Sequence, residues 1–509
     1  MDQMDELMSQ IVTGEAKGLW IAQGLPPDAL VNLHLSEAPD PAVNSSYKLG
    51  TTAQTSIGLS ALAAAHFHSL RTGEEQEVSV NARHACIEFN SEKYYTVDGK
   101  LPEGEYFDEL SEYYKTKNGF IRLHTNFPHL KQGLLEILQC PPDKASVTEA
   151  LSKWDALEFE AAARAHNLPA GALRTPEETD NHEHARTIVN VPPVHIRKIG
   201  NAPKKVIPDG AKFQHALEGI RVLDLTWILG GPVGGRTLAA HGADVLHVTS
   251  PNLHSEPLLD TETSRGKRTT QLDLNTEAGS STLWGLVKEA DVFLQSYRPN
   301  SLAQRGFGPN AVAEARPGIV YASLSGFGHE GPLNFRRGFD SLMQVVGGMS
   351  GGEADAYRSF VEATGGDASN LPPYRDLPMQ ALEHASGFLL AYGIIAALCR
   401  TITEGGSWEV NVSLVSTLFW IRSMEGVNPV SAFRYAAPLP PRALPFDPEM
   451  VSLSTEIEEA VADDEDGTQP RRKMSVIRHA ATLSKTPVLD GTATMRLDAN
   501  KPVWLPRAS

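Results

Sequence analysis

The sequence predicts an α/β fold with a parallel sheet, together with a smaller α+β region. From residue 218 onward, apolar runs such as "GIRVLDLTW", "DVFLQSY" and "IVYASLSGFG" alternate with helical stretches. Strands separated by single helices form right-handed crossovers and hence a parallel sheet. The segment 50–190 instead has a helix-rich pattern with a few strands. A length of 509 residues fits two or three domains.

Composition argues against a nucleic-acid-binding, membrane-spanning, secreted or disulfide-rich protein. A formal net charge of −17 disfavours non-specific binding to nucleic acid or anionic membranes. The acidic start "MDQMDELMSQ" lacks the pattern of a secretory signal, and the apolar run 385–399 is too short to cross a bilayer. Three scattered cysteines, Cys86, Cys140 and Cys399, do not suggest a disulfide framework. We therefore expect a cytoplasmic protein with a buried helix at 385–399.

The domain organisation is predicted from changes in pattern along the chain. A turn-prone basic segment places a boundary near residues 200–215. This divides the chain into 1–200, a sheet domain over 215–430, and a proline-rich and acidic segment, 431–509, expected to be partly disordered.

Two segments resemble each other. Residues 61–80 and 393–412 both run from an apolar helix through a Thr/Glu/Gly turn into a Glu-Val-x-Val strand, and an ungapped alignment places Glu77 on Glu409. A duplication and two ordinary helix-turn-strand units both fit this pattern.

The first crossover contains a glycine-rich turn, "GGPVGGR". Gly230 and Gly231 stand between a strand and a helix, where small residues let backbone N–H groups approach a ligand phosphate. Tight packing of the turn is the alternative.

Two basic clusters follow. In so acidic a protein they suggest a clamp for phosphates, because guanidinium and ammonium groups form charge-assisted hydrogen bonds, and an aromatic side chain suits a purine. A solvated loop is the alternative for the first cluster. The first contains Arg265, Lys267 and Arg268, and the second contains Tyr297, Arg298 and Arg305.

The stretch "QALEHASGFLLAYGIIAALCR" places Glu383 at the head of an apolar helix. If Pro378 takes the first helical position, Glu383 lies beyond the first turn, where capping no longer explains it. A carboxylate desolvated there would be a stronger nucleophile, and a surface glutamate is the alternative. We interpret a second carboxylate, Asp340, as the N-cap of the helix that it precedes.

Other catalytic patterns are weak. His182 and His184 are two positions apart and do not meet on one helix face, so we expect no metal site. There is no Gly-x-Ser-x-Gly elbow and no Walker loop.

Taken together, these motifs resemble the family III CoA-transferases, the CaiB/BaiF-like group named after carnitine and bile-acid CoA-transferases. The matching pieces include "GIRVLDLTWILGGPVGGRTLAAHGADVLHV", "RGKRTTQLDL", "RRGFDSLMQ" and "QALEHASGFLLAYGIIAAL", in order between residues 218 and about 425. Residues 105–190 are similar to the family's later half, which here comes first.

The resemblance implies a Rossmann-like domain that binds CoA, a smaller second domain and an interlocked homodimer. The family's nucleophile is an aspartate, and Glu383 occupies its position, one methylene longer. The implied substrates are an acyl-CoA and a carboxylic acid, with no cofactor beyond CoA itself. The implied CoA contacts are Gly230, Gly231, Arg265, Lys267, Arg268, Tyr297 and Arg305.

Two alternatives remain. A relative that binds CoA without turnover is suggested by the glutamate in place of aspartate. Family members also include racemases of 2-methylacyl-CoA, but their catalytic histidine corresponds to Phe339 here, which makes that reaction the weaker expectation.

Overall fold

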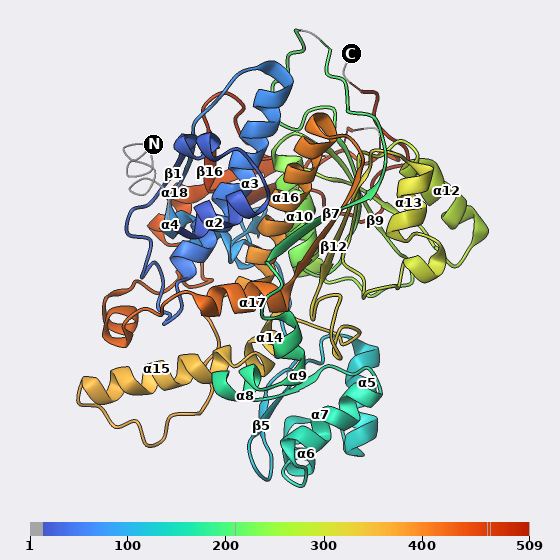
Figure 1. Ribbon diagram of the computed structural model, residues 1–509. Helices are drawn as coiled ribbons and strands as arrows, with labels where there is room; N and C mark the ends of the chain where they lie inside the picture. The colour runs from blue at the N-terminus through green and yellow to red at the C-terminus, as the bar shows by residue number, and fades with distance from the viewer. Residues whose placement is uncertain (1–13, 209, 466, 469, 508–509) are drawn as a thin grey trace.

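The computed structural model describes residues 14–208, 210–465, 467–468 and 470–507, and its largest element is a seven-stranded sheet (Figure 1). The strand order is β10-β9-β8-β11-β12-β13-β7, and all neighbours are parallel except β13 and β7. The predicted parallel sheet is thus confirmed, and its connections change direction between β8 and β11. The strands are β7 (Val194–Gly200), β8 (Arg221–Leu225), β9 (Asp244–Thr249), β10 (Arg268–Gln271), β11 (Val292–Gln295), β12 (Val320–Ser325) and β13 (Ser407–Ser413).

Helices cover both faces of this sheet, which explains why its central strands are apolar at most positions. On one face, α10 (Gly230–Ala240) and α16 (Ala381–Thr403) share a core with Val292 and Leu294 of β11. On the other, α12 (Glu277–Val287) and α13 (Pro309–Ala315) pack with Phe293. Among the described residues, α16 alone has the length and composition of a membrane-spanning helix, yet most of it is buried inside the fold, as the sequence predicts.

The smaller α+β region lies apart from the large sheet, at the bottom of Figure 1. Its antiparallel sheet is formed by β4 (Tyr113–Lys115), β5 (Phe120–Leu123) and β6 (Ala170–Ala172), and its core contains Ile121, Leu134 and Phe159. The helices in and beside this part are α5 (Pro128–Leu138), α6 (Lys144–Leu151), α7 (Ala156–Ala165), α8 (Pro176–Asp180), α9 (Glu183–Ile188), α14 (Asp340–Val346) and α15 (Met349–Ala363).

The two ends of the described chain pack together, which differs from the predicted linear division. β16 pairs with β2, and β15 pairs with β3, so residues near 480 form sheets with the first hundred residues. β7 also joins the large sheet, although it precedes the predicted boundary. The other helices and strands of the described chain are α2 (Gly14–Ala22), β1 (Leu33–Leu35), α3 (Leu49–Thr72), β2 (Val78–Val80), α4 (Ala82–Glu88), β3 (Thr96–Val97), α11 (Pro257–Thr263), α17 (Leu414–Ser423), α18 (Pro448–Leu453), β14 (Ser454–Glu458), β15 (Lys473–Ile477) and β16 (Ala481–Leu483). Short helical turns are η1 (Pro27–Asn32), η2 (Ser91–Lys93), η3 (Ala303–Arg305) and η4 (Ser431–Tyr435).

The expected disorder of residues 431–509 is also corrected for the described part of that segment. Ile457, Met474 and Val476 are buried in a small core with Tyr95, so the charged stretch around them is anchored by apolar side chains. Asp466, Gln469 and residues 508–509 lie outside the described residues, as does the acidic start at 1–13.

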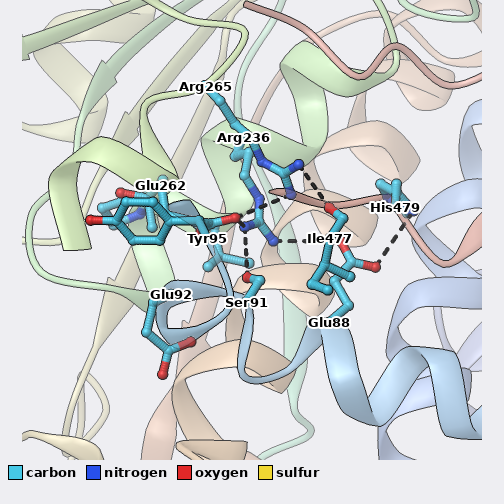
Figure 2. A network of polar contacts seen from close by, with 12 residues as sticks. Glu88, Ser91, Glu92, Tyr95, Arg236, Glu262, Arg265, Ile477 and His479 are labelled. Carbon is cyan, nitrogen blue, oxygen red and sulfur yellow. Dashed lines mark hydrogen bonds and ion pairs between the residues drawn. The ribbon is translucent and has the colours of Figure 1, made fainter. Parts of the chain in front are cut away.

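A buried network of charges joins the first hundred residues to the sheet domain (Figure 2). Arg236 of α10 contacts Glu262 of α11 and lies 3.5 Å from Glu88 of α4. The Arg265 guanidinium is 3.1 Å from Glu262 and donates to the Ile477 carbonyl at 2.8 Å. Removing one partner from such a network leaves an uncompensated buried charge.

We therefore expect Arg236→Met to lower the free energy of unfolding by about 3–5 kcal/mol. The matched control is Arg471→Met, because Arg471 lies 3.8 Å from Glu458 on the surface and such pairs contribute about 0–1 kcal/mol. Urea unfolding followed by tryptophan fluorescence measures both. Equal midpoints for the two variants would contradict the structural role of the network.

Candidate functional site

Glu383 lies where two helices begin. α16 starts at Ala381 rather than at Pro378, so Glu383 is in the first turn and not beyond it, which corrects the sequence-based placement. Its carboxylate nevertheless does not cap its own helix. The Glu383 Oε2 accepts a 2.6 Å hydrogen bond from the N–H of Gly230, the first residue of α10. The side chain is 5% exposed. The positive ends of both helices therefore favour an anion at this point.

Glycine makes this approach possible. A Cβ atom on Gly230 would lie 2.5 Å from the Glu383 Oε2, and a Cβ on Gly387 would lie 2.5 Å from the Gly230 carbonyl. One on Gly231 would lie 2.7 Å from the Thr226 Cβ. These glycines thus serve tight packing, the alternative left open above, and the Gly230 amide is bonded to Glu383.

Asp340 organises the start of α16. Its Oδ2 accepts from the N–H groups of Leu382 and Glu383 at 2.8 and 2.9 Å, and its Oδ1 accepts from the Gln344 amide. Asp340 is itself the first residue of α14, so it caps α16 and not the helix that it begins. This corrects the local N-cap interpretation.

Burial raises the pKa of both carboxyl groups, and Asp340 adds to the shift of Glu383. Burial, followed by the negative charge of Asp340, raises the pKa of Glu383 to about 8, while the hydrogen bond from Gly230 opposes this shift. Burial raises the pKa of Asp340 to about 6. Glu383 can therefore take up or release a proton near neutral pH.

A cavity of about 460 Å³ opens at the carboxyl ends of the strands. Glu383 does not itself line it, but Ile228 and Phe339 do. Ile228 lies two residues before Gly230 and Phe339 directly precedes Asp340, and both Gly230 and Asp340 contact Glu383. Ile228 has a φ of 76°, a left-handed conformation that is unfavourable for a β-branched residue. Strain of this kind is concentrated at functional sites.

Arginines give the cavity a positive wall. Arg298, Arg305 and Arg337 line it together with Tyr297, and within the described ranges none of the three forms an ion pair with a carboxylate. Burial, followed by the charge of Arg298, lowers the pKa of Arg337. The arrangement fits a ligand with several negative charges.

The first basic cluster is not at this cavity. Lys267 is fully buried and lies 2.9 Å from Asp224, and Arg265 belongs to the charge network of α4, α10 and α11. Arg268 pairs with Asp244 at 2.9 Å, where β9 and β10 begin, which is the opposite edge of the sheet. The structure thus brings Tyr297 and Arg305 together and leaves these three residues elsewhere. Arg337 was missed, although "RRGFDS" shows it just before Asp340.

Two buried histidines, His184 from the sequence analysis and His124, have internal partners. The His184 Nε2 lies 2.9 Å from the Phe327 carbonyl, and His124 stacks on Phe339 with ring centroids 3.9 Å apart. In the part of the chain that the structure describes, no group of three or more His, Cys, Asp or Glu side chains could hold a metal ion.

The stability of this site should depend on pH through Glu383. Because its folded pKa is about 8 and its ordinary value 4.5, the folded protein retains a proton that the unfolded chain releases between these values. Wild-type stability should fall as pH rises through that window. Relative to wild type, Glu383→Gln should gain about 2–5 kcal/mol between pH 5 and pH 8.

Urea unfolding at several pH values measures this difference, with Glu362→Gln as the control because Glu362 is exposed on α15, away from the site. A constant difference between wild type and Glu383→Gln across the range would contradict the raised pKa.

Part of the chain matches known proteins, and the matches carry similar descriptions. Residues 217–442 match the sequence profile of CoA-transferase family III. The chain is 31% identical to a probable fatty acyl-CoA transferase of Mycobacterium tuberculosis, over 39% of this chain and 50% of that protein. It is 26% identical to an acyl-CoA transferase of Gibberella moniliformis, over 76% and 72%. A CAIB/BAIF family protein from Brucella suis matches in structure with a TM-score of 0.35 and 26% identity, over 40% and 55%. The chain spans about half the length of most curated relatives that it matches.

Proposed function

We propose that this chain, whose residues 217–442 belong to CoA-transferase family III, moves CoA from an acyl-CoA donor to a carboxylic acid, with Glu383 as nucleophile. One observation carries the proposal: the buried Glu383 carboxyl receives the Gly230 N–H at 2.6 Å, and the segments that contact it also line a cavity with three arginines that pair with no described carboxylate. CoA carries several phosphate charges at one end and its reactive thioester at the other, which matches such a cavity.

The reaction proceeds as a relay on one carboxylate. Glu383 attacks the donor thioester carbonyl, which forms a mixed anhydride and releases the CoA thiolate. The thiolate then attacks the glutamyl carbonyl, which frees the donor acid and leaves a glutamyl-CoA thioester. An acceptor carboxylate attacks this thioester and again releases thiolate, which attacks the acceptor's acyl carbonyl. The products are a new acyl-CoA and the regenerated Glu383, so catalysis is covalent and uses no cofactor beyond CoA as substrate.

The surroundings of Glu383 support this role. A desolvated carboxylate is more nucleophilic than a hydrated one, and a pKa of about 8 keeps a fraction ionised at neutral pH. The Gly230 N–H and the two helix starts would also favour the oxyanion that forms at each attack, because preorganised donors act strongly where water is excluded.

The cavity suggests where CoA binds. Arg298, Arg305 and Arg337 would contact its phosphates, and Tyr297 its adenine, beside the thioester end at Ile228 and Phe339. This reassigns the phosphate contacts from Arg265, Lys267 and Arg268, whose charges are paired inside the protein.

A non-catalytic CoA-binding relative is the second candidate. The observation behind it is that glutamate stands where the family resemblance places aspartate, and a shift of one bond length can cost about a hundredfold in rate. A racemase finds less support, because Phe339, which has no acid–base group, stands where the family resemblance places the catalytic histidine. A cytoplasmic location without nucleic-acid or membrane partners stays a prediction from the sequence.

Trapping with hydroxylamine should identify the nucleophile. After incubation with a panel of acyl-CoA thioesters, peptide mass spectrometry should find a hydroxamate on Glu383, because hydroxylamine attacks the activated glutamyl carbonyl. Glu383→Gln is the control and should give none. If CoA binds while Glu383 stays unmodified for every donor, the non-catalytic candidate is favoured.

Binding of CoA should separate the two sets of basic residues. Arg337→Met should raise the dissociation constant of CoA about 10- to 100-fold, since a charge-assisted hydrogen bond contributes about 1.5–3 kcal/mol. Arg268→Met is the matched control and should leave affinity unchanged, because Arg268 pairs with Asp244 at the other edge of the sheet. Isothermal titration calorimetry measures both, and the reverse result would restore the first cluster as the phosphate site.

A further inference from the structure

The helix that carries Glu383 has a second copy in the same chain. Each copy contains a strand, a long helix, a second parallel strand and a short helix whose start is capped by a side chain, and in the second copy α14 and α15 are inserted before the long helix. Aligning Leu49 with Ala381 places β2 on the later part of β13, and the capping Asn81 on the capping Ser413. The first copy is β1-α3-β2-α4, and the second is β12-α16-β13-α17. The resemblance between residues 61–80 and 393–412 thus extends to the order and the ends of the elements.

The start of the long helix is held in the same way in both copies. Asp40 precedes α3 and accepts from the N–H groups of Gly50 and Thr51 at 2.7 and 3.1 Å. Asp340 accepts from the second and third residues of α16, the same two helical positions. Both helices otherwise lack a side-chain cap at the residue before their start. The two helix starts are thus held by the same kind of contact, although Asp340 lies on α14 and Asp40 in the segment just before α3.

The copies differ at the residue that carries the chemistry. In the alignment of α3 with α16, Thr51 takes the position of Glu383. The Thr51 hydroxyl donates to Asp40 at 2.6 Å and is committed to the helix start. A hydroxyl cannot form an acyl anhydride, so the first copy lacks the group that the proposed relay requires.

The first copy instead packs on the second. α3 lies alongside α16 over much of its length, the blue and orange helices of Figure 1. Phe89, just after α4, stacks on Phe388 of α16 with ring centroids 5.8 Å apart. Glu92 lies 3.0 Å from the ring of His384, the residue after Glu383, and both side chains are fully buried. Contacts between two copies of one unit are what a symmetric homodimer builds from two chains.

We infer that this chain contains its own partner: residues 33–88 are a silent copy of the catalytic-helix unit, so one chain forms one site and needs no second subunit. The homodimer expected from the family resemblance is then replaced by contacts within a single chain. The inference about the number of sites rests on the proposed function, whereas the inference about the partner does not.

The test combines molar mass and binding stoichiometry on the full chain. Sedimentation equilibrium should give the mass of one chain, 55.2 kDa, at micromolar to tens of micromolar protein. Calorimetric titration with CoA should give one site per chain. Thr51→Val should keep stoichiometry and turnover, whereas Glu383→Gln should lose turnover.

Each other outcome overturns part of the inference. A stable dimer excludes the internal partner, and two CoA molecules per chain, or loss of turnover in Thr51→Val with wild-type stability, excludes a silent first copy. If CoA does not bind at all, the proposed function fails, and the molar mass still decides whether the chain pairs with itself.

Discussion

The contact on which the site depends is the close crossing of α10 and α16 at glycine residues. Because Gly230 and Gly387 have no side chains, the start of α10 reaches the first turn of α16, and a backbone N–H meets the Glu383 carboxyl. Any side chain at Gly230 would displace that carboxyl. Ile228, two residues before Gly230, forms part of the cavity wall. The start of α10 therefore links the position of the Glu383 carboxyl to the cavity wall.

Opposing electrostatic effects act on the ionisation of Glu383 at this crossing, and the net result is a raised pKa. Burial and the neighbouring Asp340 disfavour the ionised Glu383, while the Gly230 N–H and two helix starts favour it. Asp340 accepts hydrogen bonds from the N–H groups at the start of α16. Its negative charge also raises the pKa of Glu383. Three arginines of the cavity, Arg298, Arg305 and Arg337, form no ion pair with a carboxylate in the described part of the chain, which suits the anionic substrate of the proposed function.

Much of the fold could be predicted because the sheet is covered on both faces, which produces apolar runs that local pattern detects. The partners of charged residues could not, because the pattern around Lys267 contains no trace of Asp224, which comes much earlier in the chain. Asp340 shows the same limit: its position before a helix suggests a local cap, whereas the helix it caps begins at Ala381. The pairing of β16 with β2 likewise joins distant segments, and neither carries a local sign of the other. The pattern singled out Glu383, whose side chain the structure buries, although the helix start was misplaced.

The pairing of α3 with α16 has a consequence for how the chain folds. α3 is buried along nearly its whole length, yet the helix that covers it is synthesised roughly 300 residues later, which takes on the order of 15–60 s at ~5–20 residues per second. During that interval the α3 segment lacks α16, the helix that covers it in the folded chain. Contacts between segments so distant in sequence also slow folding, because the connecting loop must close before they form. A chain that carries its own partner thus gains independence from concentration and becomes dependent on protection of its early half during synthesis.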